Sequence, residues 1–212
     1  VYLSTWSSTF VHDQWTHIVI RADSNGGKLY VNGVNINSNT DWKQHSITAR
    51  TTYIGSNSVN SNPRAKVKSV NIWNRALSAT EIETLYNQGR NYNLYGLRLD
   101  ATQDLLHSFF FETGNYQDRT GNSTVTLHNS PTVDNDGLNL VNANSQYAKL
   151  DSTYIGGTLT FALWIKVNST STNYQRFIAF GATTNMDEVI DFNQLTTNGK
   201  AYMNIRHGQT YQ

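Results

Sequence analysis

The chain has 212 residues, 38% of them hydrophobic and 12% aromatic, which is enough to bury the core of one large domain or two small ones. Its 16 basic and 15 acidic residues are interspersed and give a formal net charge of +1, so we expect no nucleic-acid partner and no anionic membrane surface as a partner. The chain has no cysteine, which excludes disulfides and thiolate metal sites, and it has no hydrophobic run long enough for membrane insertion.

Most of the chain predicts β-strands, because runs of β-branched and aromatic residues are bounded by turn residues. The expected strands are residues 15–22, 28–31, 34–36, 51–55, 66–73, 105–111, 124–127, 137–141, 147–150, 159–167, 176–180, 188–192 and 201–206. Asn32 and Gly33 lie between two of these runs and predict a type I′ hairpin, whose two central positions both need positive φ. The sequence therefore predicts an all-β protein with antiparallel sheets.

One short helix is expected within this pattern. Ser78 and Glu81 have the capping-box spacing, in which each side chain accepts a hydrogen bond from the backbone of the other residue. Ile82 and Leu85 fall on one face of the helix, and Gly89 predicts its C-terminal end. We expect a helix over about residues 79–88 that packs its apolar face on a sheet.

Two sets of motifs are similar to the two halves of one known family, in reversed order. The first set is residues 15–17, 28–33 (Lys-Leu-Tyr-Val-Asn-Gly), 53–55 and 70–82, and it resembles the second half of a laminin G-like domain of the concanavalin A-like superfamily. The second set is residues 106–111, 118–122, 137–140, 146–148 and 158–165, and it resembles the first half. The resemblance implies a jelly-roll sandwich of two antiparallel sheets.

The reversed order predicts how the domain is divided. Residues 1–90 are expected to form the C-terminal half of a laminin G-like domain, 91–95 a linker and 96–212 the N-terminal half. Placed after Gln212, Val1 continues a strand–turn–strand pattern, so the break falls inside a domain, and the missing leader indicates a mature product or an excerpt. Circular permutation, an arbitrary register along tandem repeats and strand exchange between subunits all allow this order. In each case the halves must meet, because a half-sandwich exposes sheet edges and an apolar face.

The sequence argues against catalysis. The resemblance includes relatives that cleave glucans with two neighbouring carboxylates, and the nearest acidic residues here are Asp187, Glu188 and Asp191. Strand alternation places Glu188 and Asp191 on opposite faces, and the second glutamate of the glucanase pattern is absent. We therefore expect no enzyme, and a glycoside hydrolase ranks third among the functions considered.

Calcium is the metal that the resemblance implies. The six histidines lack the paired spacing of a zinc site. Laminin G-like relatives often hold calcium with oxygen ligands from loops, and Asp118, with Asn122, is the best candidate here. Asn144 stands where the family often has an acidic residue, which lowers the expected affinity. The alternative for Asp118 is a structural Asx turn.

Glycan binding needs an exposed aromatic side chain with polar neighbours. Trp15, Trp73 and Trp164 lie in strand patterns and are expected in the core, which leaves Trp6 and Trp42 as ligand or subunit contacts. Trp42 lies in a polar loop after a hairpin. It could stack on a sugar, anchor an adjacent subunit, or fold back over the sandwich.

Two Asn-Ser-Thr triplets, beginning at Asn122 and Asn168, fit the N-glycosylation pattern and favour an extracellular or cell-surface protein. We expect a noncatalytic structural or adhesive module that self-associates with neighbouring repeats or subunits, as in a filament or surface array. The alternative is a glycan-binding, lectin-like module assisted by calcium.

Overall fold

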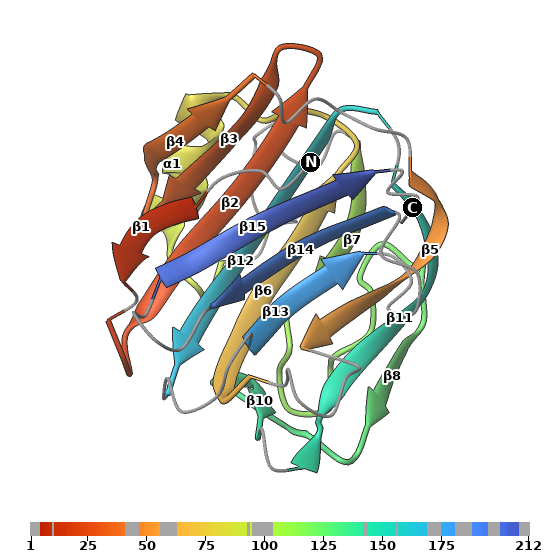
Figure 1. The fold of residues 1–212 in the computed structure, drawn as a ribbon. Helices are drawn as coiled ribbons and strands as arrows, with labels where there is room; N and C mark the ends of the chain where they lie inside the picture. Colours follow the sequence, from red (N-terminus) through yellow and green to blue (C-terminus); the bar gives the residue numbers. More distant parts are fainter. Residues whose placement is uncertain are drawn as a thin grey trace, which may run out of the picture.

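Two antiparallel β-sheets form the protein in the computed structural model (Figure 1). The structure describes residues 5–9, 11–40, 47–55, 63–92, 94, 104–141, 144–155, 157–168, 175–180, 188–194 and 200–207. The strands are β1 (Thr5–Thr9), β2 (Trp15–Asp23), β3 (Gly26–Val31), β4 (Val34–Asn39), β5 (Ile47–Gly55), β6 (Ala65–Trp73), β7 (Leu105–Phe109), β8 (Val125–His128), β9 (Thr132–Asp134), β10 (Gly137–Leu140), β11 (Tyr147–Ile155), β12 (Leu159–Val167), β13 (Gln175–Phe180), β14 (Glu188–Gln194) and β15 (Lys200–His207). Helix α1 spans Ala79–Gln88.

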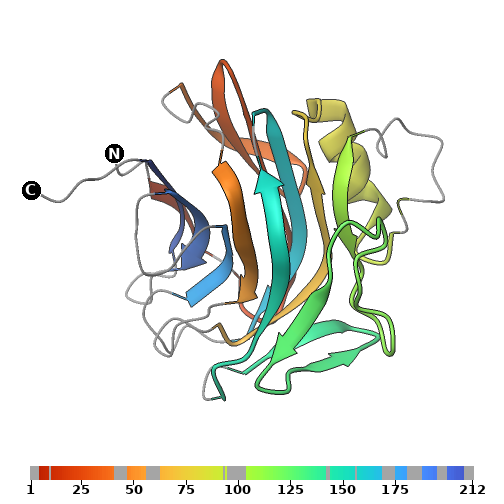
Figure 2. The same ribbon diagram turned by 90° about the vertical axis from the view of Figure 1, so that its right-hand side faces the viewer.

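The sheets pack face to face, with α1 on the outer side of one of them (Figure 2). The seven-stranded sheet has the order β1-β15-β14-β13-β5-β11-β8. The eight-stranded sheet has the order β4-β3-β2-β12-β6-β10-β9, with β7 also paired to β6. These layers confirm the expected all-β sandwich. No helix among the described residues is long and apolar enough to cross a membrane.

Strands from the two segments of the chain alternate in both sheets. In Figure 1, β5 lies between β13 and β11, and β12 lies between β2 and β6. At the edge of the seven-stranded sheet, β1 pairs antiparallel with β15. In this structure, then, residues 1–90 and 96–212 complete each other's sheets within one chain. The choice among permutation, repeat register and strand exchange stays a prediction.

The main core lies between the sheets and consists of aliphatic and aromatic side chains from both segments. Phe161 of β12 and Phe180 of β13 meet edge to face across the two sheets, with ring centroids 5.6 Å apart. Burial of a side chain of this size stabilises the fold by about 1.5–3 kcal/mol. The alternation of inward and outward residues predicts this core, because inward positions recur every second residue.

Helix α1 begins at the predicted capping box. The Glu81 backbone N–H donates to Ser78 Oγ at 3.2 Å, and the Ser78 N–H donates to Glu81 Oε2 at 2.7 Å. Hydrogen bonds from Arg75 are the main reason that the pKa of Glu81 falls from 4.5 to about 2. Ile82 and Leu85 pack in a second core on the outer face of the eight-stranded sheet.

The Asn32–Gly33 hairpin is also confirmed, because the two residues have φ values of 50° and 80°. A Cβ atom on Gly33 would lie 3.1 Å from a ring carbon of Tyr86 in α1, so this turn supports the helix from one side. The Asn32 side chain accepts a hydrogen bond from the backbone N–H of His17 at 2.9 Å.

The tryptophan prediction is confirmed only for Trp73, which is fully buried beneath α1. Trp15 and Trp164 are half-buried, so their assignment to the core is wrong. The Arg90 guanidinium and the Lys166 ammonium lie 5.0 Å and 5.5 Å from the Trp15 ring centroid. The pattern misleads because both faces of the eight-stranded sheet carry apolar residues, while α1 covers only part of its outer face.

Candidate functional site

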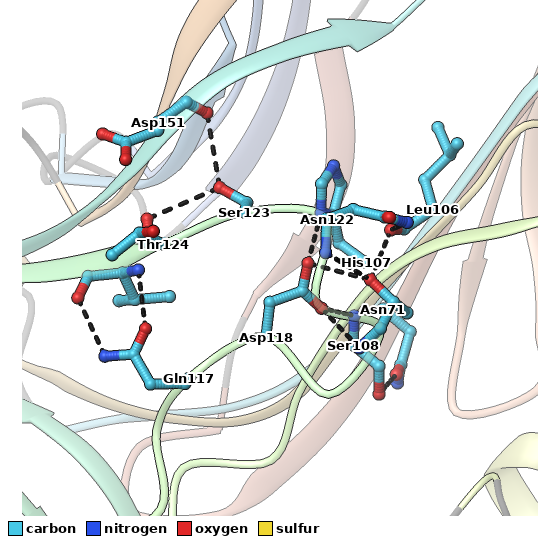
Figure 3. Close-up of polar contacts among 12 residues, drawn as sticks. Asn71, Leu106, His107, Ser108, Gln117, Asp118, Asn122, Ser123, Thr124 and Asp151 are labelled. Carbon is cyan, nitrogen blue, oxygen red and sulfur yellow. Dashed lines mark hydrogen bonds and ion pairs between the residues drawn. The ribbon is translucent and has the colours of Figure 1, made fainter.

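The predicted calcium residue Asp118 lies in the loop between β7 and β8, where its carboxylate is enclosed by donors (Figure 3). Oδ1 accepts from the backbone N–H groups of Ser108, at 2.9 Å, and Thr120, at 3.1 Å. Oδ2 contacts His107 Nδ1 at 2.6 Å and accepts from Thr120 Oγ1 at 2.9 Å. The side chain has no solvent exposure.

These contacts keep Asp118 ionised inside the protein. Burial raises the pKa of its carboxyl, but the hydrogen bonds from His107, Ser108 and Thr120 outweigh burial and lower the pKa below its ordinary value. Since each oxygen already accepts two hydrogen bonds, none faces outward to bind a cation. Asp118 therefore does not fit a calcium ligand and acts as an Asx-turn anchor for the loop. The part of the chain described here also contains no group of three acidic or histidine side chains able to hold a metal ion.

The two predicted glycosylation sites differ in accessibility. Asn122 is exposed, and its Nδ2 donates to the Leu106 carbonyl at 2.8 Å, which ties the loop to β7. Asn168 is half-buried after β12, and its Oδ1 is buried without a hydrogen-bond partner in the structure. Glycosylation of either residue stays a prediction, and the geometry favours Asn122.

The remaining predicted site residues lie at the edge of the described structure or outside it. Trp6 lies in β1, while Trp42 and Asp187 lie outside the described residues. Glu188 and Asp191 lie in β14, where their register partners in β15 are His207 and Asn204. Neither β1 nor β14 pairs with β7 or β8, the strands on either side of the Asp118 loop.

An open groove of about 260 Å³ lies at one end of the eight-stranded sheet. It is lined by residues of the stretch 21–28, which includes the β2–β3 turn, and by residues 38–40 at the end of β4. Thr40 is the last of these residues, two positions before Trp42. The groove and the predicted Trp42 loop are thus adjacent in the chain.

The β2–β3 turn shapes the floor of the groove. The backbone N–H of Asn25 donates to Asp23 Oδ1 at 2.8 Å, which closes the turn. Gly26 has φ 124°, and a Cβ atom on it would lie 2.4 Å from the Asn39 carbonyl oxygen and 2.7 Å from the Thr40 Cα. Only glycine allows the end of β4 to approach this closely.

The charges in the groove are unequally paired. Arg21 Nη2 donates to Asp23 Oδ2 at 3.0 Å, and its Nη1 donates to the Leu77 carbonyl at 2.7 Å. Lys28 pairs with Arg21 in the β2–β3 register, so both side chains extend from the same face of the sheet. Among the described residues, no hydrogen bond or ion pair is made to the Lys28 side chain. Together with the amide of Asn25 and the hydroxyls of Ser38 and Thr40, it gives the groove both donors and acceptors.

Sequence reasoning did not identify this groove. The groove is formed by two polar hairpin ends, at residues 23–27 and 38–40, and polar stretches of this kind are typical of ordinary solvated turns. Only the neighbouring Trp42 loop was singled out.

The comparison with known protein families places part of this fold. No curated protein matches the chain. A family model described as the concanavalin A-like lectin/glucanases superfamily, of laminin G type, matches residues 2–83. This segment contains β1 to β6 and extends into α1. The match covers less than half of the chain; it supports the resemblance found for the first set of motifs and does not reach the second set.

Proposed function

We propose that this protein is a noncatalytic, lectin-like module that binds a glycan in the groove at the end of β2, β3 and β4. The observation that carries the proposal is the set of side chains that line the groove, which include amide, hydroxyl and ammonium groups. A sugar presents hydroxyls that both donate and accept, and such a lining matches them. The superfamily match over residues 2–83 supports a lectin-like module at the same coarse level.

The size of the groove limits what it can hold. Its volume of about 260 Å³ is below the range of about 300–1,000 Å³ that is typical of small-molecule sites. We therefore expect it to take a terminal sugar residue instead of enclosing a long segment. If the Trp42 side chain reaches the rim, it would add a stacking surface for the next residue.

Binding of the monomeric protein to a glycan panel, followed by calorimetry on the hits, tests the proposal. Asn25→Ala removes a side-chain amide from the groove and leaves the backbone N–H that closes the turn. Loss of one such hydrogen bond, about 1 kcal/mol, weakens binding about fivefold. Asn135→Ala is the matched control, since Asn135 is exposed in the equivalent turn between β9 and β10. Failure of the monomer to bind any glycan, or equal binding by Asn25→Ala, contradicts the proposal.

A structural or adhesive module that self-associates is the second candidate function. The edge strand β4 exposes Val34 by 64% and Ile36 by 38%, and these are among the few large hydrophobic side chains exposed in the described residues. β4 carries no charge or proline, the usual devices that protect a sheet edge from pairing with another chain. Sedimentation analysis across concentrations, with Val34→Lys as the edge-blocking variant, tests this candidate. Assembly that the variant abolishes favours it, and a monomer at all concentrations contradicts it.

Both candidates place the protein outside the cell or on its surface, as the resemblance to laminin G-like domains implies. Neither candidate function involves a reaction of the bound ligand. Cleavage of a polysaccharide that is lost on changing Glu188 or Asp191 would contradict the noncatalytic part of the proposal.

A further inference from the structure

We infer that the groove selects a sugar that carries a carboxylate, such as a uronic acid, and that Lys28 is the residue that selects it. This inference rests on the proposed function, because it names the class of glycan that the same groove takes.

The acidic side chain of the groove is already neutralised. Both oxygens of Asp23 accept hydrogen bonds within the protein, from the Asn25 N–H at 2.8 Å and from Arg21 Nη2 at 3.0 Å. The side chains of Arg21 and Asp23 are only 17% and 21% exposed, so the pair is held close and shielded in part from water. Asp23 therefore has little charge left to repel an anionic ligand.

Lys28 is the cation of the groove that has no partner among the described residues. It lines the groove from the strand next to that of Arg21. Two cations thus line the groove with one carboxylate, which leaves an excess of positive charge at a half-buried position. An anionic ligand gains most from such a group, because the ammonium is partly desolvated before the ligand arrives.

Two other cations on this face of the sheet have an acidic partner, which distinguishes Lys28 from them. Lys66 lies 3.2 Å from Asp136, and Arg90 lies 3.0 Å from the same carboxylate. A free anion must compete with Asp136 for these two groups, whereas no carboxylate among the described residues competes for Lys28.

The dimensions of the groove favour a carboxylate over a bulkier acidic group. Oxidation of a hydroxymethyl group to a carboxylate adds a single oxygen to a sugar, and the rest of the ring keeps its hydroxyls for Asn25, Ser38 and Thr40. A sulfate ester adds a whole sulfonate group, for which an open groove of about 260 Å³ offers little further room.

Calorimetry with matched sugars tests the inference, using an oligoglucuronate and the neutral oligoglucose of the same length and linkage. The wild-type protein is expected to bind the acidic oligosaccharide about tenfold more tightly, which corresponds to about 1.4 kcal/mol. This preference should shrink as salt is raised, because salt screens the exposed part of the interaction. Lys28→Gln should weaken binding of the acidic oligosaccharide much more than binding of the neutral one, and so remove the preference. Lys28→Arg should keep it.

Lys149→Gln is the matched control, since Lys149 is a half-buried strand lysine on the other sheet. It should change neither affinity. Equal binding of acidic and neutral sugars by the wild type overturns the inference and leaves the proposed function standing. Binding of neither sugar, or of any other glycan, overturns both. A preference that survives in Lys28→Gln overturns the role of Lys28.

Discussion

Acidification should loosen the packing of α1 on the eight-stranded sheet, because His17 is buried there in its neutral form. His17 is 3% exposed and contacts two aromatic rings, with its ring centroid 5.0 Å from that of Trp164 and 6.1 Å from that of Tyr86. Its Nδ1 is buried without a hydrogen-bond partner. Burial lowers the pKa of His17 from 6.5 to about 3.

The sign and size of the effect follow from these two pKa values. Between about pH 6.5 and pH 3 the unfolded chain carries a proton on His17 that the folded protein does not, so the free energy of unfolding falls as the pH falls. The full contribution of neutral His17 is present above pH 6.5. The loss is about 1.4 kcal/mol per pH unit, or about 2 kcal/mol between pH 7 and pH 5 and about 5 kcal/mol in total.

Urea unfolding at pH 7, 6 and 5 measures this loss. His17→Phe keeps a ring in contact with Trp164 and Tyr86 but cannot be protonated, so the difference between the two proteins isolates the titration of His17. The wild type should lose about 2 kcal/mol more than His17→Phe between pH 7 and pH 5. His12→Gln, at an exposed position before β2, should behave as the wild type. Parallel pH profiles for the wild type and His17→Phe would refute the reasoning.

Three further predictions concern the turn, the loop and the helix. Gly26→Ala should destabilise the fold by about 2–4 kcal/mol and abolish glycan binding, because its Cβ would lie 2.4 Å from the Asn39 carbonyl oxygen. Urea unfolding measures the stability, and calorimetry measures the binding. Asp118→Ala should lower stability by about 3–5 kcal/mol, since it leaves His107 and two backbone donors without their acceptor, and calcium should not change the Tm of the wild type in a thermal scan. Glu81→Gln should lower the free energy of unfolding by about 1 kcal/mol. In the wild type, the contribution of ionised Glu81 is present above pH 4.5 and is lost as the pH falls towards 2, and the variant should lack this pH dependence. Unfolding at pH 5 and pH 3 measures the difference.

Each of these predictions has a control or a contrary outcome in the same protein. Gly114→Ala, where a Cβ would meet nothing within 4 Å, should cost less than Gly26→Ala. A rise in Tm on adding calcium that is lost in Asp118→Ala would restore Asp118 as a metal ligand. Glu83→Gln, at an exposed position of α1, should leave the acid profile of the wild type unchanged, and the same profile in Glu81→Gln would contradict the role of the cap.

Local chemistry made much of the fold predictable. Asn32 and Gly33 specify their turn by themselves, because positive φ at both positions is a property of two residues and not of the tertiary structure. The Ser78–Glu81 capping box defines the start of α1 for the same reason. β9 was missed, since its three residues, Thr132–Asp134, form a strand only through their pairing with β10.

The candidate site was less predictable, because it forms where separate elements meet. The groove exists because the end of β4 comes against Gly26, and β3 and β4 reach that point through an irregular register between Leu29 and Tyr30. No local stretch of the sequence indicates that the end of β4 lies close to Gly26. Likewise, the resemblance to laminin G-like domains implied a calcium site in the 118–122 loop, and only the positions of the His107 and Ser108 donors show that the Asp118 oxygens are occupied.

Two hairpins in this protein close in the same way but leave different surfaces. In both, an aspartate accepts a hydrogen bond from the residue two positions later, Asn25 N–H to Asp23 at 2.8 Å and Asp136 N–H to Asp134 at 2.7 Å. In both, a glycine with φ near 125° follows, and a neighbouring backbone approaches it closely.

What differs is the pairing of the lysine beside each turn. Lys66 of the neighbouring strand β6 lies 3.3 Å from Asp134 and 3.2 Å from Asp136, so the β9–β10 turn neutralises this cation. At the β2–β3 turn, Asn25 takes the place that corresponds to Asp136, and Lys28 of β3 has no acidic partner among the described residues. Because the backbone chemistry is shared, the turn itself explains the two glycines and the two aspartates. It does not explain why Lys28 has no carboxylate partner among the described residues, and the acidic sugar that we infer would supply one.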